Sequence, residues 1–185
     1  MKIKVGVMGS ANDTLPEGVS ESLRAKAESL GREIARRDCF LLTGATTGLT
    51  YIVGQSAREK GAFHIGISPA SNEREHVETY NLPLDSTDAI IYTGFGLKGR
   101  NVVLVRSCDI VLFISGSWGS LNEFTIAHDE GRVIGCLTGT GGVADEAERL
   151  LQDLPKKREA CVLHGDNPAR LLAACFEAFG QIEKV

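Results

Sequence analysis

The chain has 185 residues, with 20 Lys and Arg against 24 Asp and Glu, which gives a formal net charge of −4. This acidity argues against a protein that binds nucleic acid or an anionic membrane, because both partners require basic patches. The hydrophobic content of 43% excludes disorder, and no run of about 18 apolar residues is present to span a membrane. The 21 glycines follow no collagen-like repeat, so we expect them in turns or ligand-binding loops.

Cysteine and histidine show no metal-binding spacing. The five cysteines are widely separated and lie in apolar stretches, which favours small buried hydrophobic residues in a reducing compartment. None of the four histidines has a ligand-spaced partner, so we expect no metal site. The first residues lead directly into a strand-like segment without a signal-peptide pattern. We therefore expect a cytoplasmic protein.

Short β-branched runs alternate with amphipathic helical patterns along the whole chain. This alternation is typical of an α/β sandwich, in which helices flank a mainly parallel sheet. In chain order, the pattern predicts a strand at 3–8, a helix at 21–38, a strand at 39–42, a helix at 49–60, strands at 64–68, 89–92 and 110–114, a helix at 120–130, a strand at 133–137, a helix at 143–153, a strand at 161–163 and a helix at 168–181. No linker or repeat divides these elements, so we expect one domain over residues 1–185.

Two segments do not fit this alternation. Residues 69–88 are polar and unpatterned, which in a compact domain indicates either a functional loop or an element that the pattern does not reveal. Residues 100–106 have the composition of a strand, and residues 107–109 could form a hairpin turn. Local propensity alone therefore favours a hairpin at this point.

The glycines gather directly after the predicted strands. The carboxyl ends of parallel strands meet at one edge of a sheet, where ligands usually bind, although glycine also serves tight turns. Residues 94–99 read G-x-G-x-x-G, the dinucleotide fingerprint, but they lie in the middle of the chain and no acidic residue follows at the expected distance. The sequence therefore favours a ligand crevice, but not one for NAD or FAD. The clusters are Gly9; Gly44 and Gly48; Gly94, Gly96 and Gly99; Gly116 and Gly119; and Gly139, Gly141 and Gly142.

The segment after the strand at 110–114 carries the strongest signal. A glycine-rich turn opens a predicted amphipathic helix, where Ser117, Ser120 and free N–H groups could hold a phosphate. Glu123 would lie close to that anion, as a catalytic group or as the acidic member of a Ser-x-x-Glu capping box. Hydroxyl groups at Ser10 and at residues 46–47 could bind the same ligand or cap helices.

Three segments together resemble the Lonely Guy / lysine-decarboxylase-like superfamily: residues 43–49 (TGATTGL), 99–101 (GRN) and 116–123 (GSWGSLNE). The hallmark of the superfamily is P-G-G-x-G-T-x-x-E, preceded by a helix that carries Arg-Lys. The resemblance covers about residues 3–150, and Arg100-Asn101 and the loop at 137–142 are most similar to the branch of the molybdenum cofactor carrier proteins. It implies a Rossmann-like three-layer sandwich in which residues 98–107 form a helix with Arg100 facing the crevice. This overrules the hairpin.

The resemblance implies two functions. The first is binding of a phosphorylated nucleotide-like or pterin-type ligand, such as a nucleoside monophosphate or the molybdenum cofactor, with no further cofactor required. The alternative is a phosphoribohydrolase that cleaves the N-glycosidic bond of a nucleoside 5′-monophosphate, with Arg100 and Glu123 as catalytic residues. A lysine decarboxylase is not implied, whereas a homo-oligomer, dimer or tetramer, is. The expected ligand-binding residues are Gly9, Ser10, Gly44, Thr46, Thr47, Gly48, Asn101, Gly116, Ser117, Gly119 and Ser120.

The chain departs from the superfamily pattern at several positions. Loss of two charged groups weakens the hydrolase expectation more than it weakens anion binding, and Arg100 and Glu123 are retained. Purely structural glycine loops are a third alternative. The departures are Ser115 for Pro, Ser117 for Gly, Ser120 for Thr, Asn122 for the first acidic residue and Asn101 for Lys.

Overall fold

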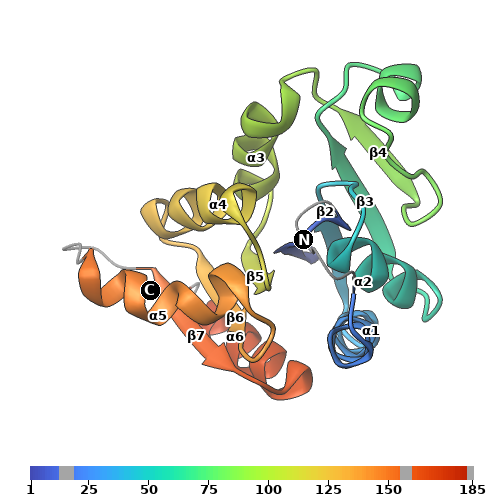
Figure 1. Cartoon of the computed structure of the whole chain (residues 1–185). Coiled ribbons are helices and arrows are strands. Elements are labelled where there is room, and N and C mark those ends of the chain that lie inside the picture. The colour runs from blue at the N-terminus through green and yellow to red at the C-terminus, as the bar shows by residue number, and fades with distance from the viewer. Residues whose placement is uncertain (13–18, 155–159, 183–185) are drawn as a thin grey trace.

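The computed structural model describes residues 1–12, 19–154 and 160–182, and one sheet runs through them (Figure 1). Seven strands are arranged in the order β4-β3-β2-β1-β5-β6-β7, and every pairing between neighbours is parallel. The expected α/β sandwich is confirmed. The strands are β1 (Ile3–Gly9), β2 (Cys39–Thr43), β3 (Phe63–Ser68), β4 (Ala89–Tyr92), β5 (Ile110–Ile114), β6 (Val133–Leu137) and β7 (Cys161–Gly165).

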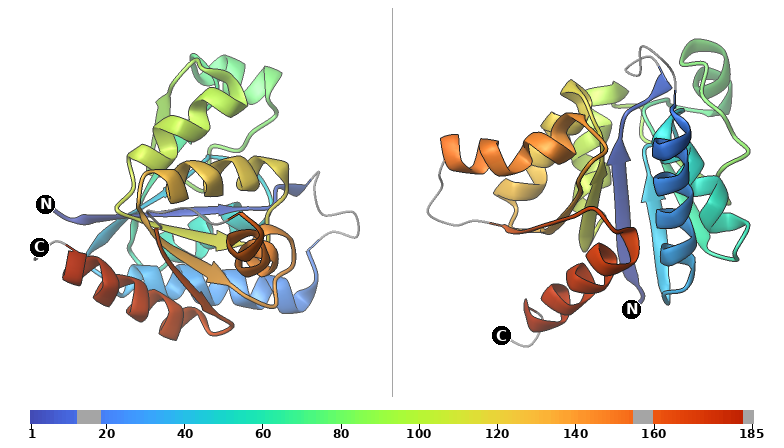
Figure 2. Two further views of the ribbon diagram at one scale, coloured as in Figure 1. Left: turned by 90° about the vertical axis from the view of Figure 1, so that its left-hand side faces the viewer. Right: turned by 60° about the horizontal axis from the view of Figure 1, so that its bottom comes forward.

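Helices cover both faces of the sheet (Figures 1 and 2). One face carries α1 (Glu21–Ala35), α2 (Leu49–Arg58) and α6 (Pro168–Ile182), and the other carries α3 (Gly96–Arg106), α4 (Trp118–Asp129) and α5 (Gly142–Asp153). Because both faces are covered, β5 and β6 are buried at every residue, which explains their uninterrupted apolar sequence. No helix within the described residues is both long and apolar enough to cross a bilayer.

The helix expected at residues 98–107 is confirmed as α3, and the hairpin that local propensity favours is wrong. The chain must cross from β4 at one edge of the sheet to β5 on the far side of β1. A parallel connection of this kind requires a crossover, usually a helix, rather than a tight turn. Arg100, Asn101, Leu104 and Val105 form the buried stripe of this helix.

The other boundaries differ from the predicted ones by a few residues. Helix α1 ends at Ala35, whereas β7 extends to Gly165. The unpatterned segment at 69–88 contains one short π-helix, η2 (Glu75–Thr79), which the sequence does not reveal. Helix α4 begins at Trp118 rather than at residue 120, and this small shift changes the role of Glu123.

Candidate functional site

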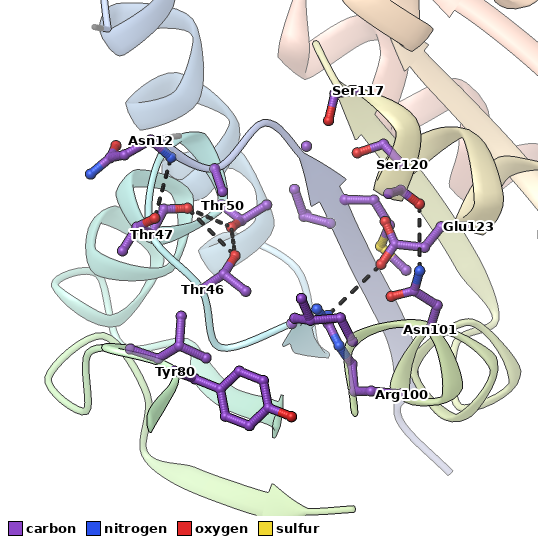
Figure 3. A pocket seen from close by; sticks show the side chains of 18 of the residues that line it. Asn12, Thr46, Thr47, Thr50, Tyr80, Arg100, Asn101, Ser117, Ser120 and Glu123 are labelled. Carbon is purple, nitrogen blue, oxygen red and sulfur yellow. Dashed lines mark hydrogen bonds and ion pairs between the residues drawn. The ribbon is translucent and has the colours of Figure 1, made fainter. Parts of the chain in front are cut away.

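The order of the strands creates a crevice beside β1. Strands β2, β3 and β4 lie in succession on one side of β1, whereas β5, β6 and β7 lie in succession on the other side. The connections therefore diverge at the carboxyl ends of β1 and β5, the point where open α/β sheets usually bind ligands. A pocket of about 520 Å³ lies there (Figure 3).

The pocket brings together segments that are distant in the sequence. They are the loops after β1 and β2, the first turn of α2, residues 80–82, the first two turns of α3 and α4, and part of β1. Ten of the thirteen residues expected at the site line the pocket: Gly9, Gly44, Thr46, Thr47, Arg100, Asn101, Ser117, Gly119, Ser120 and Glu123.

The other three expected residues, Ser10, Gly48 and Gly116, connect the loops behind the pocket. The hydroxyl group of Ser10 lies 3.0 Å from that of Ser115 and accepts a hydrogen bond of 3.0 Å from the N–H of Gly116. Gly48 has a φ of 79°, and a side chain there would overlap with the backbone of Ser10. Ser10 therefore joins the loops that follow β1 and β5.

Arg100 and Glu123 form a buried ion pair in the pocket. Each is 6% exposed, and Arg100 Nη1 lies 3.8 Å from Glu123 Oε1, too far for a hydrogen bond (Figure 3). The buried Nε of Arg100 has no hydrogen-bond partner among the described residues. A buried donor of this kind costs free energy unless a ligand or water accepts from it.

Burial acts on both charges of this pair. It raises the pKa of Glu123 to about 7, although Arg100 and Lys98 pull in the opposite direction. Burial also lowers the pKa of Arg100 from its ordinary value, against the attraction of Glu123. Desolvation therefore exceeds the attraction across 3.8 Å.

The N-terminus of α4 borders the pocket without a side-chain cap. Ser117 is the N-cap residue and makes no capping hydrogen bond, so the first N–H groups of the helix remain available to an anion. Because the helix begins at Trp118, Glu123 lies in its second turn. A capping box needs its acidic residue at the third helical position, so the capping role considered for Glu123 is wrong.

Two departures from the superfamily pattern are in direct contact. Asn101 Nδ2 donates to Asn122 Oδ1 over 2.9 Å. With its amide group turned over, Asn101 would place that nitrogen 3.1 Å from Glu123 Oε1. A neutral amide pair therefore lies beside Glu123 at the positions where the superfamily pattern has charged residues.

The threonines on the opposite wall bond to each other and to the neighbouring loop. Thr46 and Thr50 join their hydroxyl groups over 3.2 Å, and Thr47 Oγ1 accepts from the N–H of Asn12 (Figure 3). The N-cap residue of α2, Gly48, makes no side-chain capping bond. The threonine hydroxyl groups therefore form a polar wall of the pocket and do not cap α2.

A buried histidine fixes the loop that follows β2. His64 Nδ1 contacts the carbonyl oxygen of Ser86, which can only accept, so this nitrogen carries the proton. Nε2 consequently accepts from the hydroxyl group of Thr43 over 2.8 Å, and Thr43 Oγ1 accepts from the N–H of Ala45. Burial lowers the pKa of His64 to about 4, which agrees with a neutral ring.

Sequence reasoning missed several residues that line the pocket. The unpatterned segment at 69–88 indicated a functional loop or an unrevealed element, without showing which of its residues line the pocket. Lys98 lies within the G-x-G-x-x-G segment, whose position in the middle of the chain argues against a dinucleotide site. The missed residues with polar or large side chains are Met8, Asn12, Thr50, Tyr80, Asn81, Leu82, Leu97 and Lys98. No group of three His, Cys, Asp or Glu within the described ranges could hold a metal ion.

Known proteins share this fold over nearly the full chain. The structure of TM1055, a structural-genomics target, is 28% identical, with a TM-score of 0.82 over 96% of this chain and 99% of that one. The molybdenum cofactor binding protein of Rippkaea orientalis is 25% identical, with a TM-score of 0.73 over 98% of each chain. The molybdenum cofactor carrier protein of Chlamydomonas reinhardtii is 24% identical, with a TM-score of 0.74 over 97% of this chain and 99% of that one.

These similarities confirm the Rossmann-like three-layer sandwich and the resemblance to the branch of the carrier proteins. The model of the SLOG cluster4 family matches residues 2–172. The match includes every segment that lines the pocket. The chain therefore belongs to the SLOG cluster4 family.

Proposed function

We propose that the pocket binds a small phosphorylated ligand of the nucleotide or pterin type, in the manner of a cofactor carrier. The observation that carries this proposal is Arg100, a buried cation at the pocket whose Nε has no partner among the described residues. Arg100 lines the same cavity as the uncapped N-terminus of α4, so a phosphate between them would meet a guanidinium and helix N–H groups together.

The similar structures support the nature of the ligand. The Rippkaea orientalis protein is described as a molybdenum cofactor binding protein, and it matches this chain over 98% of its length. In our proposal the ligand is cargo, and Ser117 and Ser120 add hydroxyl donors around its phosphate. The molybdenum cofactor and a nucleoside monophosphate both meet this description.

Thermal unfolding of the purified protein with inorganic phosphate, AMP, neopterin phosphate and isolated molybdenum cofactor tests the proposal. A ligand that binds only the folded state raises the Tm in proportion to its affinity and concentration. We expect a rise with at least one phosphorylated probe, and its loss in Arg100→Met. Arg106→Met is the matched control, because Arg106 lies on the same helix, is exposed and pairs with Glu130 outside the pocket. Unchanged Tm values with all probes, including isolated molybdenum cofactor, would reject the proposal.

One observation favours the phosphoribohydrolase as a second candidate. The pKa of Glu123 near 7 suits a group that exchanges protons at neutral pH, and Arg100 is its neighbour. Hydrolysis of AMP would add water across the bond between the ribose and the base, and release adenine and ribose 5-phosphate in equal amounts. Chromatography should detect both products with the wild type and neither with Glu123→Gln. Intact AMP after long incubation would eliminate this candidate.

A further inference from the structure

We propose that Tyr80, with Leu82 and Leu97, forms a subsite for the planar heterocycle of the ligand. This inference rests on the proposed function and deepens it, because it assigns the two ends of the ligand to different walls of the pocket. Figure 3 shows the Tyr80 ring at one end of the cavity and Ser117 and Ser120 at the other. The phosphate would lie at the serine end, and the ring would lie against Tyr80.

The composition of the pocket supports this division. Arg100, Glu123 and the α4 N-terminus supply polar groups to the pocket, whereas Tyr80, Leu82 and Leu97 supply a partly buried aromatic ring and two apolar side chains. An aromatic face stacks on purine and pterin rings, because each offers a flat π surface. The cavity volume of about 520 Å³ falls within the range of roughly 300–1,000 Å³ that is common for small-molecule sites.

A second buried histidine anchors the segment that carries Tyr80. His76 Nε2 donates to the carbonyl oxygen of Pro83 over 3.1 Å, and Nδ1 accepts from the hydroxyl group of Ser68 over 2.8 Å. Ser68 Oγ in turn accepts from the N–H of Ala70. The arrangement is like that at His64, where the imidazole ring joins a strand-end hydroxyl group to a backbone carbonyl oxygen of residues 83–86.

His76 therefore links Pro83 to Ser68 at the end of β3. His64 links Ser86 to Thr43 at the end of β2. The backbone adds two hydrogen bonds of 3.1 Å, from Tyr80 N to Glu75 O and from Leu82 N to His76 O. Between them, Asn81 has a φ of 52°, a left-handed conformation that asparagine tolerates better than most residues. This anchoring positions Tyr80 before a ligand arrives, which lowers the entropy lost on binding.

Titration calorimetry with matched probes tests the subsite. AMP and ribose 5-phosphate share the phosphate and the sugar, so the ratio of their affinities isolates the contribution of the ring. Neopterin phosphate provides the pterin probe, and the tighter of the two ring-bearing probes identifies the class of heterocycle. We expect that probe to bind the wild type about tenfold more tightly than ribose 5-phosphate does.

Tyr80→Ala should remove this preference and leave the affinity for ribose 5-phosphate unchanged, whereas Tyr80→Phe should retain the preference. Phe95→Ala is the matched control, because Phe95 is an exposed aromatic residue that does not line the pocket. If the wild type binds ribose 5-phosphate as tightly as AMP and neopterin phosphate, the ring subsite is wrong and the phosphate site stands. Binding of none of the three probes would overturn both. An equal loss for all probes in Tyr80→Ala would also contradict the subsite, because it would indicate damage to the loop.

Discussion

Gly44 and Arg100 are in a contact that only glycine permits at position 44. A Cβ atom built on Gly44 would overlap with Nη1 of the guanidinium group. The backbone at the end of β2 thus forms one side of the cage that holds Arg100, and Glu123 lies on another side. The glycine that the motif contributes here makes room for the Arg100 side chain.

Gly44→Ala should therefore displace Arg100 and weaken binding of a phosphorylated ligand. We expect an affinity loss of tenfold or more, since a charge-assisted hydrogen bond contributes about 1.5–3 kcal/mol. Calorimetry with the best-binding probe measures the change. Gly180→Ala is the control, because a Cβ there meets no atom within 4 Å. Equal affinity of Gly44→Ala and the wild type would show that the position of Arg100 does not matter for binding.

Ser10→Ala should destabilise the protein. The substitution leaves the buried N–H of Gly116 without its acceptor and removes the contact with Ser115. We expect the free energy of unfolding to fall by about 1–3 kcal/mol, measured by urea denaturation. Ser22 is exposed on α1, so Ser22→Ala should change stability by less than about 0.5 kcal/mol. If the two variants are equally stable, the connection between the loops contributes nothing measurable.

Glu123 should make the protein less stable as the pH rises. Burial raises its pKa from 4.5 to about 7, so in this interval the folded state binds more protons than the unfolded state. Stability should be highest below about pH 4.5 and should decrease until the pH exceeds about 7, with each unit of pKa shift corresponding to about 1.4 kcal/mol. In Glu123→Gln this decrease should disappear. Denaturation at pH 5 and pH 8 provides the test, and an identical difference in both proteins would contradict the raised pKa.

His64 should have the opposite effect. Burial lowers its pKa from 6.5 to about 4, so the unfolded state binds more protons between these values. This contribution is complete above about pH 6.5 and is lost as the pH falls towards 4. His64→Gln should be less stable at pH 7 but should lose less stability on acidification than the wild type does. The windows of His64 and Glu123 overlap with opposite signs, so each variant must be compared with the wild type over the whole range. A parallel loss on acidification would contradict the neutral imidazole.

The strands could be predicted because their apolar runs are buried on both faces. The run at residues 110–114 has no polar residue to interrupt it, and each of its side chains proved to be buried. Arg100 and Glu123 entered the site through the motif resemblance, whereas composition and spacing left their roles open. The structure places them 3.8 Å apart as a buried ion pair.

Other features depend on contacts that no local pattern carries. Residues 102–105 are rich in valine and leucine, and only the position of β4 and β5 on opposite sides of β1 makes them helical. Residues 80–82 line the pocket because His76 and His64 bind the segment that follows them, residues 83–86, to the ends of β3 and β2. The role of Glu123 depended on a two-residue difference in the start of α4, which is within the usual uncertainty of helix boundaries.

The central position of β1 has a consequence for the stability of the whole chain. Strands β2, β3 and β4 lie on one side of β1, and β5, β6 and β7 lie on the other. Residues that follow strands of both groups line the pocket. A molecule that fills the pocket bridges the two halves of the sheet and resists their separation. The proposed ligand should therefore slow global unfolding, and proteases should cleave the ligand-free protein first.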